Sequence, residues 1–187
     1  SFLVELLWKY EEAEALSFAS AAIKEALERP EEVEMVRTGL RDPLAVPIRR
    51  ALRLIPEIKD IIAFLQRSGF EVWAIGDDAQ WFLRAMVGEY GLEASRAIGI
   101  RAEVKESKII SRILDPVPFR GGKADAMVSA LGREPDLVLG ADPWDVEMLS
   151  YGRGVRILLD KGDETLRELA AEKGWLVQPA FAPAPPG

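Results

Sequence analysis

The chain has 187 residues, 49% of them hydrophobic, and its 24 basic and 31 acidic side chains give a formal net charge of −7. This profile predicts one globular domain with at most a small insertion, and the absence of Cys and His excludes disulfides, thiolate sites and imidazole chemistry. The acidic balance argues against a nucleic-acid partner, and no apolar run approaches the roughly 20 residues of a membrane span, so we expect a cytoplasmic protein.

The first third of the chain is predicted to be mostly helical. Apolar residues at helical spacing favour a helix over residues 11–28. Pro30 ends this helix, and the acidic pair that follows it predicts the start of a second helix. A break is expected over residues 39–47, and a further amphipathic helix over residues 56–67.

From residue 70 onward, short apolar runs alternate with helical patterns. The predicted strands cover residues 70–75, 97–104, 108–114, 136–140, 155–159 and 175–177, and the predicted helices cover 79–90, 123–131 and 164–173. The second and third strands are expected to form a hairpin. Apolar strands alternating with helices favour an α/β fold with a parallel central sheet in three Rossmann-like layers. The Pro-rich tail, residues 181–187, is predicted to be disordered.

Acidic residues follow two of these strands directly. Asp77 and Asp78 come after the first strand, and Asp142 and Asp145 follow the strand over residues 136–140. Because ligand sites in parallel sheets gather at the carboxyl ends of the strands, these acids would suit a divalent cation or a phosphoryl centre. Capping of the helices that follow is the alternative explanation, and we favour it for both pairs.

Four segments in this order resemble the haloacid dehalogenase superfamily, specifically its phosphoserine-phosphatase-like branch. They are PEIKDIIAFLQRSGFEVWAIG, RAIGIRAEV, GGKADAM and DLVLGADPWDVEML. The resemblance implies a Rossmann-like core formed by residues 1–10 and 55–180, with a small helical cap over residues 11–54. Members of this family transfer a phosphoryl group through an aspartyl-phosphate on an Asp-x-Asp motif, with a Lys on the phosphate and Mg²⁺ beside it. By resemblance, Lys123 is that phosphate-binding lysine, and Asp142 and Asp145 are the candidates for holding Mg²⁺.

The chain departs from the family pattern at the catalytic positions, because it contains no Asp-x-Asp motif. If residues 2–7 form the family's first strand, Glu5 takes the nucleophile position and Leu7 the acid/base position. Gly76 stands where the family has a Ser or Thr, and Ala141 replaces the first metal-binding Asp. Loss of the nucleophile, the proton shuttle and a metal ligand together predicts loss of catalysis, so no residue is assigned a catalytic role.

The family's first strand lies in the middle of its sheet, between the strands of the second and fourth motifs. A chain without it would have two unpaired inner edges, which is costly. We therefore favour residues 2–7 as a degenerate first strand over a helix. The alternative is that an Asp-x-Asp strand precedes Ser1 in the natural protein.

These observations predict a pseudo-phosphatase that acts as a binding, scaffold or regulatory protein, with a protein or a phosphorylated small molecule as its partner and no cofactor. The alternative is an active Mg²⁺-dependent phosphomonoesterase with a rearranged or truncated nucleophile motif. A third option is a phosphate sensor that keeps Lys123 and has lost the chemistry.

Overall fold

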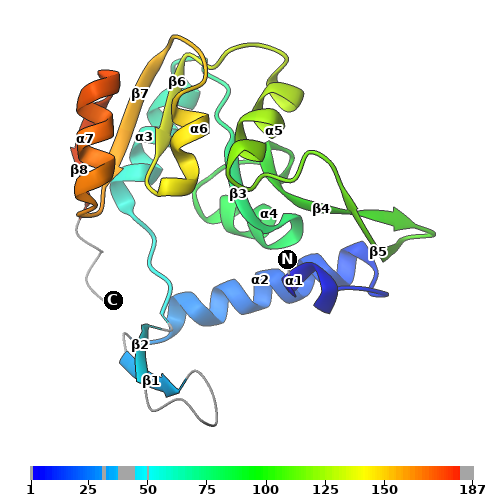
Figure 1. Ribbon diagram of the computed structural model, residues 1–187. Coiled ribbons are helices and arrows are strands. Elements are labelled where there is room, and N and C mark those ends of the chain that lie inside the picture. The colour runs from blue at the N-terminus through cyan, green and yellow to red at the C-terminus, as the bar shows by residue number, and fades with distance from the viewer. Residues whose placement is uncertain (1, 31–32, 38–44, 50, 182–187) are drawn as a thin grey trace.

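The computed structural model of the protein describes residues 2–30, 33–37, 45–49 and 51–181 (Figure 1). The fold is mixed α/β. The strands are β1 (Val33–Arg37), β2 (Ala45–Arg49), β3 (Ala74–Ala79), β4 (Ala97–Lys105), β5 (Lys108–Leu114), β6 (Leu137–Gly140), β7 (Val155–Asp160) and β8 (Leu176–Pro179). The helices are α1 (Phe2–Leu6), α2 (Glu12–Glu28), α3 (Pro56–Arg67), α4 (Gln80–Glu89), α5 (Gly121–Leu131), α6 (Val146–Leu149) and α7 (Glu164–Lys173), with 3₁₀ turns η1 (Ala94–Arg96) and η2 (Pro143–Asp145). In these parts of the chain, no helix combines the length and apolarity needed to cross a membrane.

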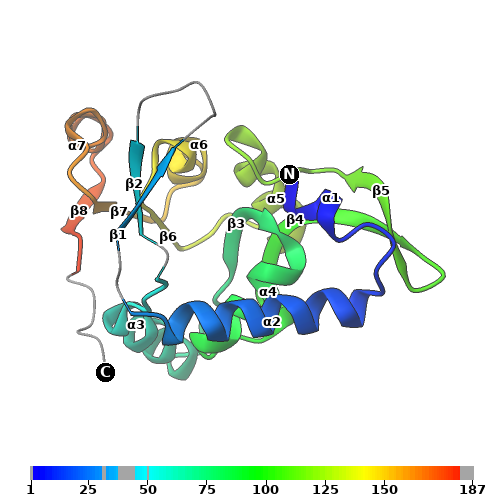
Figure 2. The same cartoon turned by 90° about the horizontal axis from the view of Figure 1, so that it is seen from below.

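The strands of the described chain form three sheets. β1 pairs with β2 in an antiparallel hairpin. β3 pairs in parallel with β4, which forms the predicted antiparallel hairpin with β5. β6, β7 and β8 form a fully parallel sheet. Figure 2 shows β6–β8 on one side of the molecule and β3–β5 on the other, with no strand drawn between β3 and β6.

Most of the elements predicted after residue 56 are confirmed, and helix α7 begins and ends close to its expected positions. Its N-cap is Asp163, whose carboxylate accepts a hydrogen bond from the Leu166 N–H, as expected of a capping Asp. The strand predicted over residues 70–75 is displaced, because β3 begins at Ala74. Asp77 and Asp78 therefore belong to the strand itself rather than to a loop or a helix cap.

The prediction that residues 2–7 form the first strand is wrong. This segment forms helix α1, whose end is closed by the hydrogen bond from the Leu7 N–H to the Val4 carbonyl. Val4 of α1 and Leu7 just after it are buried in a cluster with Ile100 and Ile109, so this segment packs against β4 and β5. Val4 and Leu7 are thus accommodated by this cluster and not by the centre of a sheet.

The second helix predicted after Pro30 is also wrong, since Val33–Arg37 is a strand paired with β2. Alternating Val and Met side chains suit a two-stranded ribbon, and Pro47 is tolerated because β2 is an edge strand. The expected helical cap over residues 11–54 is thus one helix and a hairpin, and α2 packs along α4 of the core. Residues 39–44 of the predicted break and residues 182–187 of the predicted tail lie outside the described residues, whereas residues 45–47, also in the predicted break, belong to strand β2.

The buried apolar residues fall into three separate clusters. One lies among α1, α2, α4 and the β4–β5 hairpin, and a second lies among α5, α6, α7 and the β6–β8 sheet. A smaller third cluster joins α4 to β4, with α3 at its margin. A domain ordinarily has one contiguous core, whereas here the buried residues of β4–β5 and of β6–β8 belong to different clusters, and Ile75 of β3 packs at the margin of the second.

Candidate functional site

The carboxyl ends of β3 and β6 meet at Lys123. This residue lies in the first turn of α5 and is buried, and its Nζ lies 2.7 Å from Oδ1 of Asp145, which is also buried. Partial burial and the charge of Asp77 raise the pKa of Asp78, at the end of β3, and the charge of Lys123 opposes part of this shift. The structure therefore brings together Lys123 and Asp145, two of the residues singled out in the sequence.

A close backbone approach sets the position of Lys123. The Cα of Gly122 lies so near the loop before α5 that an added Cβ would be 1.9 Å from the carbonyl oxygen of Val117. Only glycine fits this contact. A cation at a helix N-terminus is unfavourable, and Asp145 offsets this cost for Lys123.

The carboxylate of Asp145 is fully engaged. Its Oδ1 accepts from Lys123, while its Oδ2 accepts from the backbone N–H groups of Ala141 at 2.8 Å and Asp142 at 3.1 Å. Asp142 in turn caps the Asp145 backbone, so both residues belong to a reciprocal capping box. The Asp142 carboxylate forms a half-exposed ion pair with Lys161 at 3.2 Å.

This arrangement does not fit Mg²⁺, which is usually held by one or two carboxylates that are free to bind it, together with waters. Both oxygens of Asp145 already accept hydrogen bonds, Asp142 is paired with Lys161, and Ala141 has no side-chain oxygen. Within the described ranges, no group of three or more acidic side chains is placed to hold a metal ion. The donors needed for metal-assisted chemistry are therefore not assembled by these residues.

The other predicted positions are dispersed. Glu5 is exposed on α1 and Leu7 is buried beyond its end, so neither occupies a strand position, and their predicted alignment with the nucleophile and the acid/base is wrong. Gly76 lies within β3 and Ala141 directly follows β6, as their strands require. Neither residue supplies a hydroxyl or a carboxylate.

Trp144 belongs to an aromatic cluster beside this site, which the sequence analysis did not identify. Its ring centroid lies 5.7 Å from that of Phe119, and the Arg120 guanidinium lies 4.3 Å from the Trp144 ring centroid. Trp144 and Phe119 are both exposed. The cluster joins the loop before α5 to the turn after β6, so it holds the two segments that carry Lys123 and Asp145.

Two carboxylates near the strand ends have shifted pKa values of opposite sign. Partial desolvation and the charge of Asp77 raise the pKa of Asp78, although its side chain reaches solvent and Lys123 partly opposes the shift. The backbone N–H of Gly162 and the Arg167 guanidinium lower the pKa of Asp160. The folded protein therefore disfavours the ionised form of Asp78 and favours the ionised form of Asp160.

The two residues should respond oppositely to conversion to the neutral amide. A raised pKa means that the folded state loses stability as the pH rises through the titration of Asp78, so Asp78→Asn should raise the free energy of unfolding at pH 7. A lowered pKa means that the contribution of Asp160 is lost as the pH falls, so Asp160→Asn should lower that free energy at pH 7. Both differences should shrink as the pH falls and the wild-type carboxyls become protonated. Urea unfolding at several pH values measures this, and changes of equal sign at pH 7 would contradict it.

Comparison with known proteins gives structural relatives only. No protein-family model and no curated protein matches the sequence. The fold is similar to a conserved functionally unknown protein from Anaerococcus prevotii DSM 20548, with a TM-score of 0.78 and 18% identity over 92% of this chain and 50% of that one. It is also similar to a protein with unknown function from Bordetella pertussis Tohama I, with a TM-score of 0.56 and 19% identity over 68% and 59%. At these identities the likeness shows a shared fold, and this chain spans half the length of the Anaerococcus protein.

Proposed function

We propose that this chain is a pseudo-phosphatase of the haloacid dehalogenase type, which has lost phosphoryl-transfer chemistry and acts by binding a partner. The observation that carries the proposal is the buried ion pair between Lys123 and Asp145. The lysine that would bind a phosphate in the family is here occupied by a carboxylate of the same chain.

The electrostatics support loss of catalysis. An anionic nucleophile approaching an anionic phosphate needs positive charge that is free to act on the reacting oxygens. Asp145 compensates the charge of Lys123, and its own oxygens are engaged by Lys123 and two backbone N–H groups. The sequence contains no Asp-x-Asp to attack the phosphate. The missing Asp-x-Asp and the pairing of Lys123 with Asp145 support the proposal that phosphoryl transfer is lost.

The order of elements supports the finer fold assignment. From α3 to β8, helices alternate with strands apart from the β4–β5 hairpin, Lys123 lies at the start of α5, and the loop after β6 carries Asp145. This order agrees with the Rossmann-like architecture that the motif resemblance implies. The proposed fold is accordingly a three-layer α/β core in which β3 and β6 flank the central position.

An active Mg²⁺-dependent phosphomonoesterase is the second candidate. It is favoured by the gathering of Asp78 and Asp145 around Lys123 at the carboxyl ends of β3 and β6. It would require an attacking carboxylate from outside the described residues and a rearrangement that releases Lys123.

A phosphatase assay tests the proposal directly. Purified protein incubated with Mg²⁺ and p-nitrophenyl phosphate, or with phosphoserine, is expected to release no more phosphate than the Lys123→Met variant. Circular dichroism of both proteins verifies that they are folded. Turnover by the wild type that Lys123→Met abolishes would establish the phosphomonoesterase instead.

A further inference from the structure

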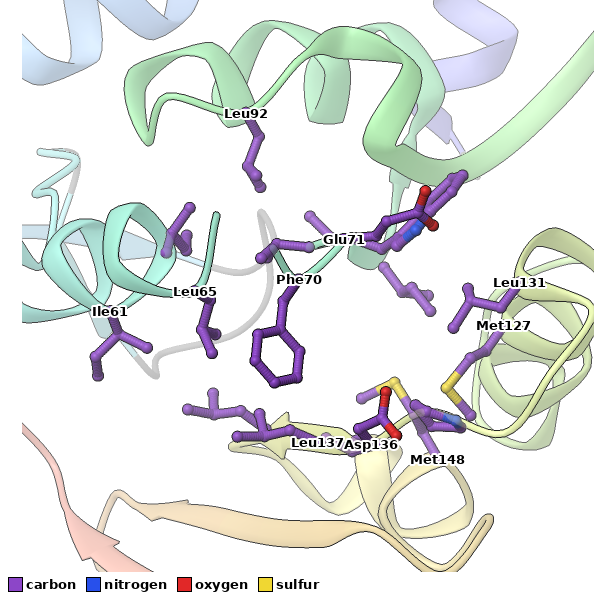
Figure 3. Close-up of a pocket in the computed structure, with 18 of the residues that line it drawn as sticks. Ile61, Leu65, Phe70, Glu71, Leu92, Met127, Leu131, Asp136, Leu137 and Met148 are labelled. Atoms are coloured by element: carbon purple, nitrogen blue, oxygen red, sulfur yellow. The ribbon is translucent and has the colours of Figure 1, made fainter. Parts of the chain in front are cut away.

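An apolar cavity of about 350 Å³ separates β3 from β6. We call it the interstrand slot and define it by Ile75 of β3, Val138 of β6, Ile58 and Leu65 of α3, Met127 of α5 and Met148 of α6, all of which line it. Figure 3 shows Leu65 and Phe70 extending from one side, and Met127, Met148 and Leu131 on the opposite side. The slot thus has a strand on each flank and helices above and below.

Both strands present an unpaired edge to the slot. In the described chain, β3 is hydrogen-bonded to β4 alone and β6 to β7 alone, so each is the last strand of its sheet. Residues of both strands line the same cavity. Peptide groups on such inner edges are costly when they lack partners, and a small apolar ligand would fill the space without satisfying them.

The two edges have the same direction. The residues at or just before the amino ends of β3 and β6, Trp73 and Leu137, line the slot together. At the other end, α5 packs against β3, and Lys123 of this helix is hydrogen-bonded to Asp145, which follows β6. β3 and β6 therefore run parallel to each other, as two strands separated by one position in a parallel sheet would.

Helix α3 has an apolar face that no other part of the described chain fully covers. Its apolar residues recur at helical spacing on one face, yet none of its residues is fully buried, and Ile61 is 40% exposed. A helix gains most of its stability from burying such a face. The exposed face of α3 lies over the slot, so whatever fills the slot would also cover α3.

We propose that the interstrand slot binds one extended apolar peptide strand from outside residues 1–187, inserted parallel to β3 and β6. The strand would join the two three-stranded sheets, with alternate side chains against α3 and against α5 and α6. This occupant deepens the proposed function, since it defines the chemistry of the partner. It satisfies two rows of backbone groups at once, which neither a small molecule nor a second copy contacting one edge would do.

A synthetic peptide tests the insertion. The probe is a fluorescein-labelled peptide of about seven residues, with Val and Ile in the centre and Lys at both ends, and its control carries Pro at the central position. Proline removes an amide donor and blocks one edge, so its affinity should be lower by about tenfold or more in fluorescence anisotropy. Hydrogen exchange should show new protection of β3 and β6 amides. Equal binding of both peptides, or protection confined to β5 or β8, would overturn the proposal.

A matched pair of variants on α3 locates the binding site. Leu65→Asp places a charge in the slot and should weaken peptide binding about tenfold or more, because the buried carboxylate would have no partner. Phe64→Asp introduces the same charge one residue away, at a side chain that is 60% exposed and does not line the slot. This second variant should bind the peptide as the wild type does. Equal loss in both variants would overturn the proposal.

A fusion protein tests strand insertion even if the free peptide binds weakly. The same peptide is fused ahead of Ser1 through a flexible Gly/Ser linker of about 20 residues, which raises its effective concentration. The fusion should raise Tm by about 5 °C or more and the Pro-containing fusion should not. No shift, or a shift that accompanies dimerisation in light scattering, would overturn strand insertion. Because this readout needs no turnover, it fails independently of the phosphatase assay.

Discussion

Asp145→Ala is expected to lower the free energy of unfolding by about 3 to 5 kcal/mol, because it leaves the buried Lys123 ammonium without its hydrogen-bonded carboxylate. It also removes the acceptor of the Ala141 and Asp142 N–H groups. Chemical denaturation at pH 7 measures the loss. The size of the effect follows from burial, since the side chains of Lys123 and Asp145 are only 7% and 11% exposed.

Lys161→Ala provides the matched control for this prediction. It breaks the neighbouring ion pair with Asp142, whose partners are both about half exposed, so we expect a cost of roughly 0 to 1 kcal/mol. The double variant Lys123→Met, Asp145→Asn should recover part of the loss seen in Asp145→Ala, because no uncompensated charge remains. Equal costs for Asp145→Ala and Lys161→Ala would show that the buried pair is not a structural element.

Gly122→Ala is expected to destabilise the protein by about 3 kcal/mol or more, because its Cβ would be placed 1.9 Å from the Val117 carbonyl oxygen. The atom in the way belongs to the backbone, so relief requires movement of the loop before α5. That movement would displace Lys123, which directly follows Gly122. Thermal unfolding and urea denaturation both measure the effect.

Gly121→Ala is the neighbouring control. No atom lies within 4 Å of its added Cβ, and it occupies the first residue of α5. Substitution there should leave stability unchanged or raise it by about 0.4 to 1 kcal/mol, since Ala restricts the unfolded chain more than Gly does. A Gly122→Ala variant as stable as Gly121→Ala would contradict the close backbone approach.

The candidate site was only partly predictable from the chain. Lys123 was singled out because its segment GGKADAM resembles the part of the family that carries the phosphate-binding lysine, and the structure places it buried in the first turn of α5. That Asp145 would be its partner was not visible, because the ion pair joins residues 22 positions apart in sequence. Asp78 was interpreted as a helix cap because an acidic pair before a helix usually has that role.

The structure of residues 2–7 also could not be predicted from the local sequence. Residues 2–7 are apolar enough for a sheet centre or for a helix packed on a core, and a short apolar run does not distinguish the two. Val4 and Leu7 pack in a cluster with Ile100 and Ile109, and this burial stabilises the helix. The inner edges of β3 and β6, which a central strand would have covered, lack partners in the described chain.

Local periodicity and capping chemistry by themselves determined α3, α7, the β4–β5 hairpin and the mixed α/β class, because hydrophobic spacing and capping residues act within a few positions. The tertiary structure alone decided that Asp145 neutralises Lys123, that residues 2–6 are helical and that the sheet is divided between β3 and β6. Each of these depends on burial against residues distant in sequence, where the free energy of a charge, an apolar side chain or a strand edge is set by what packs against it.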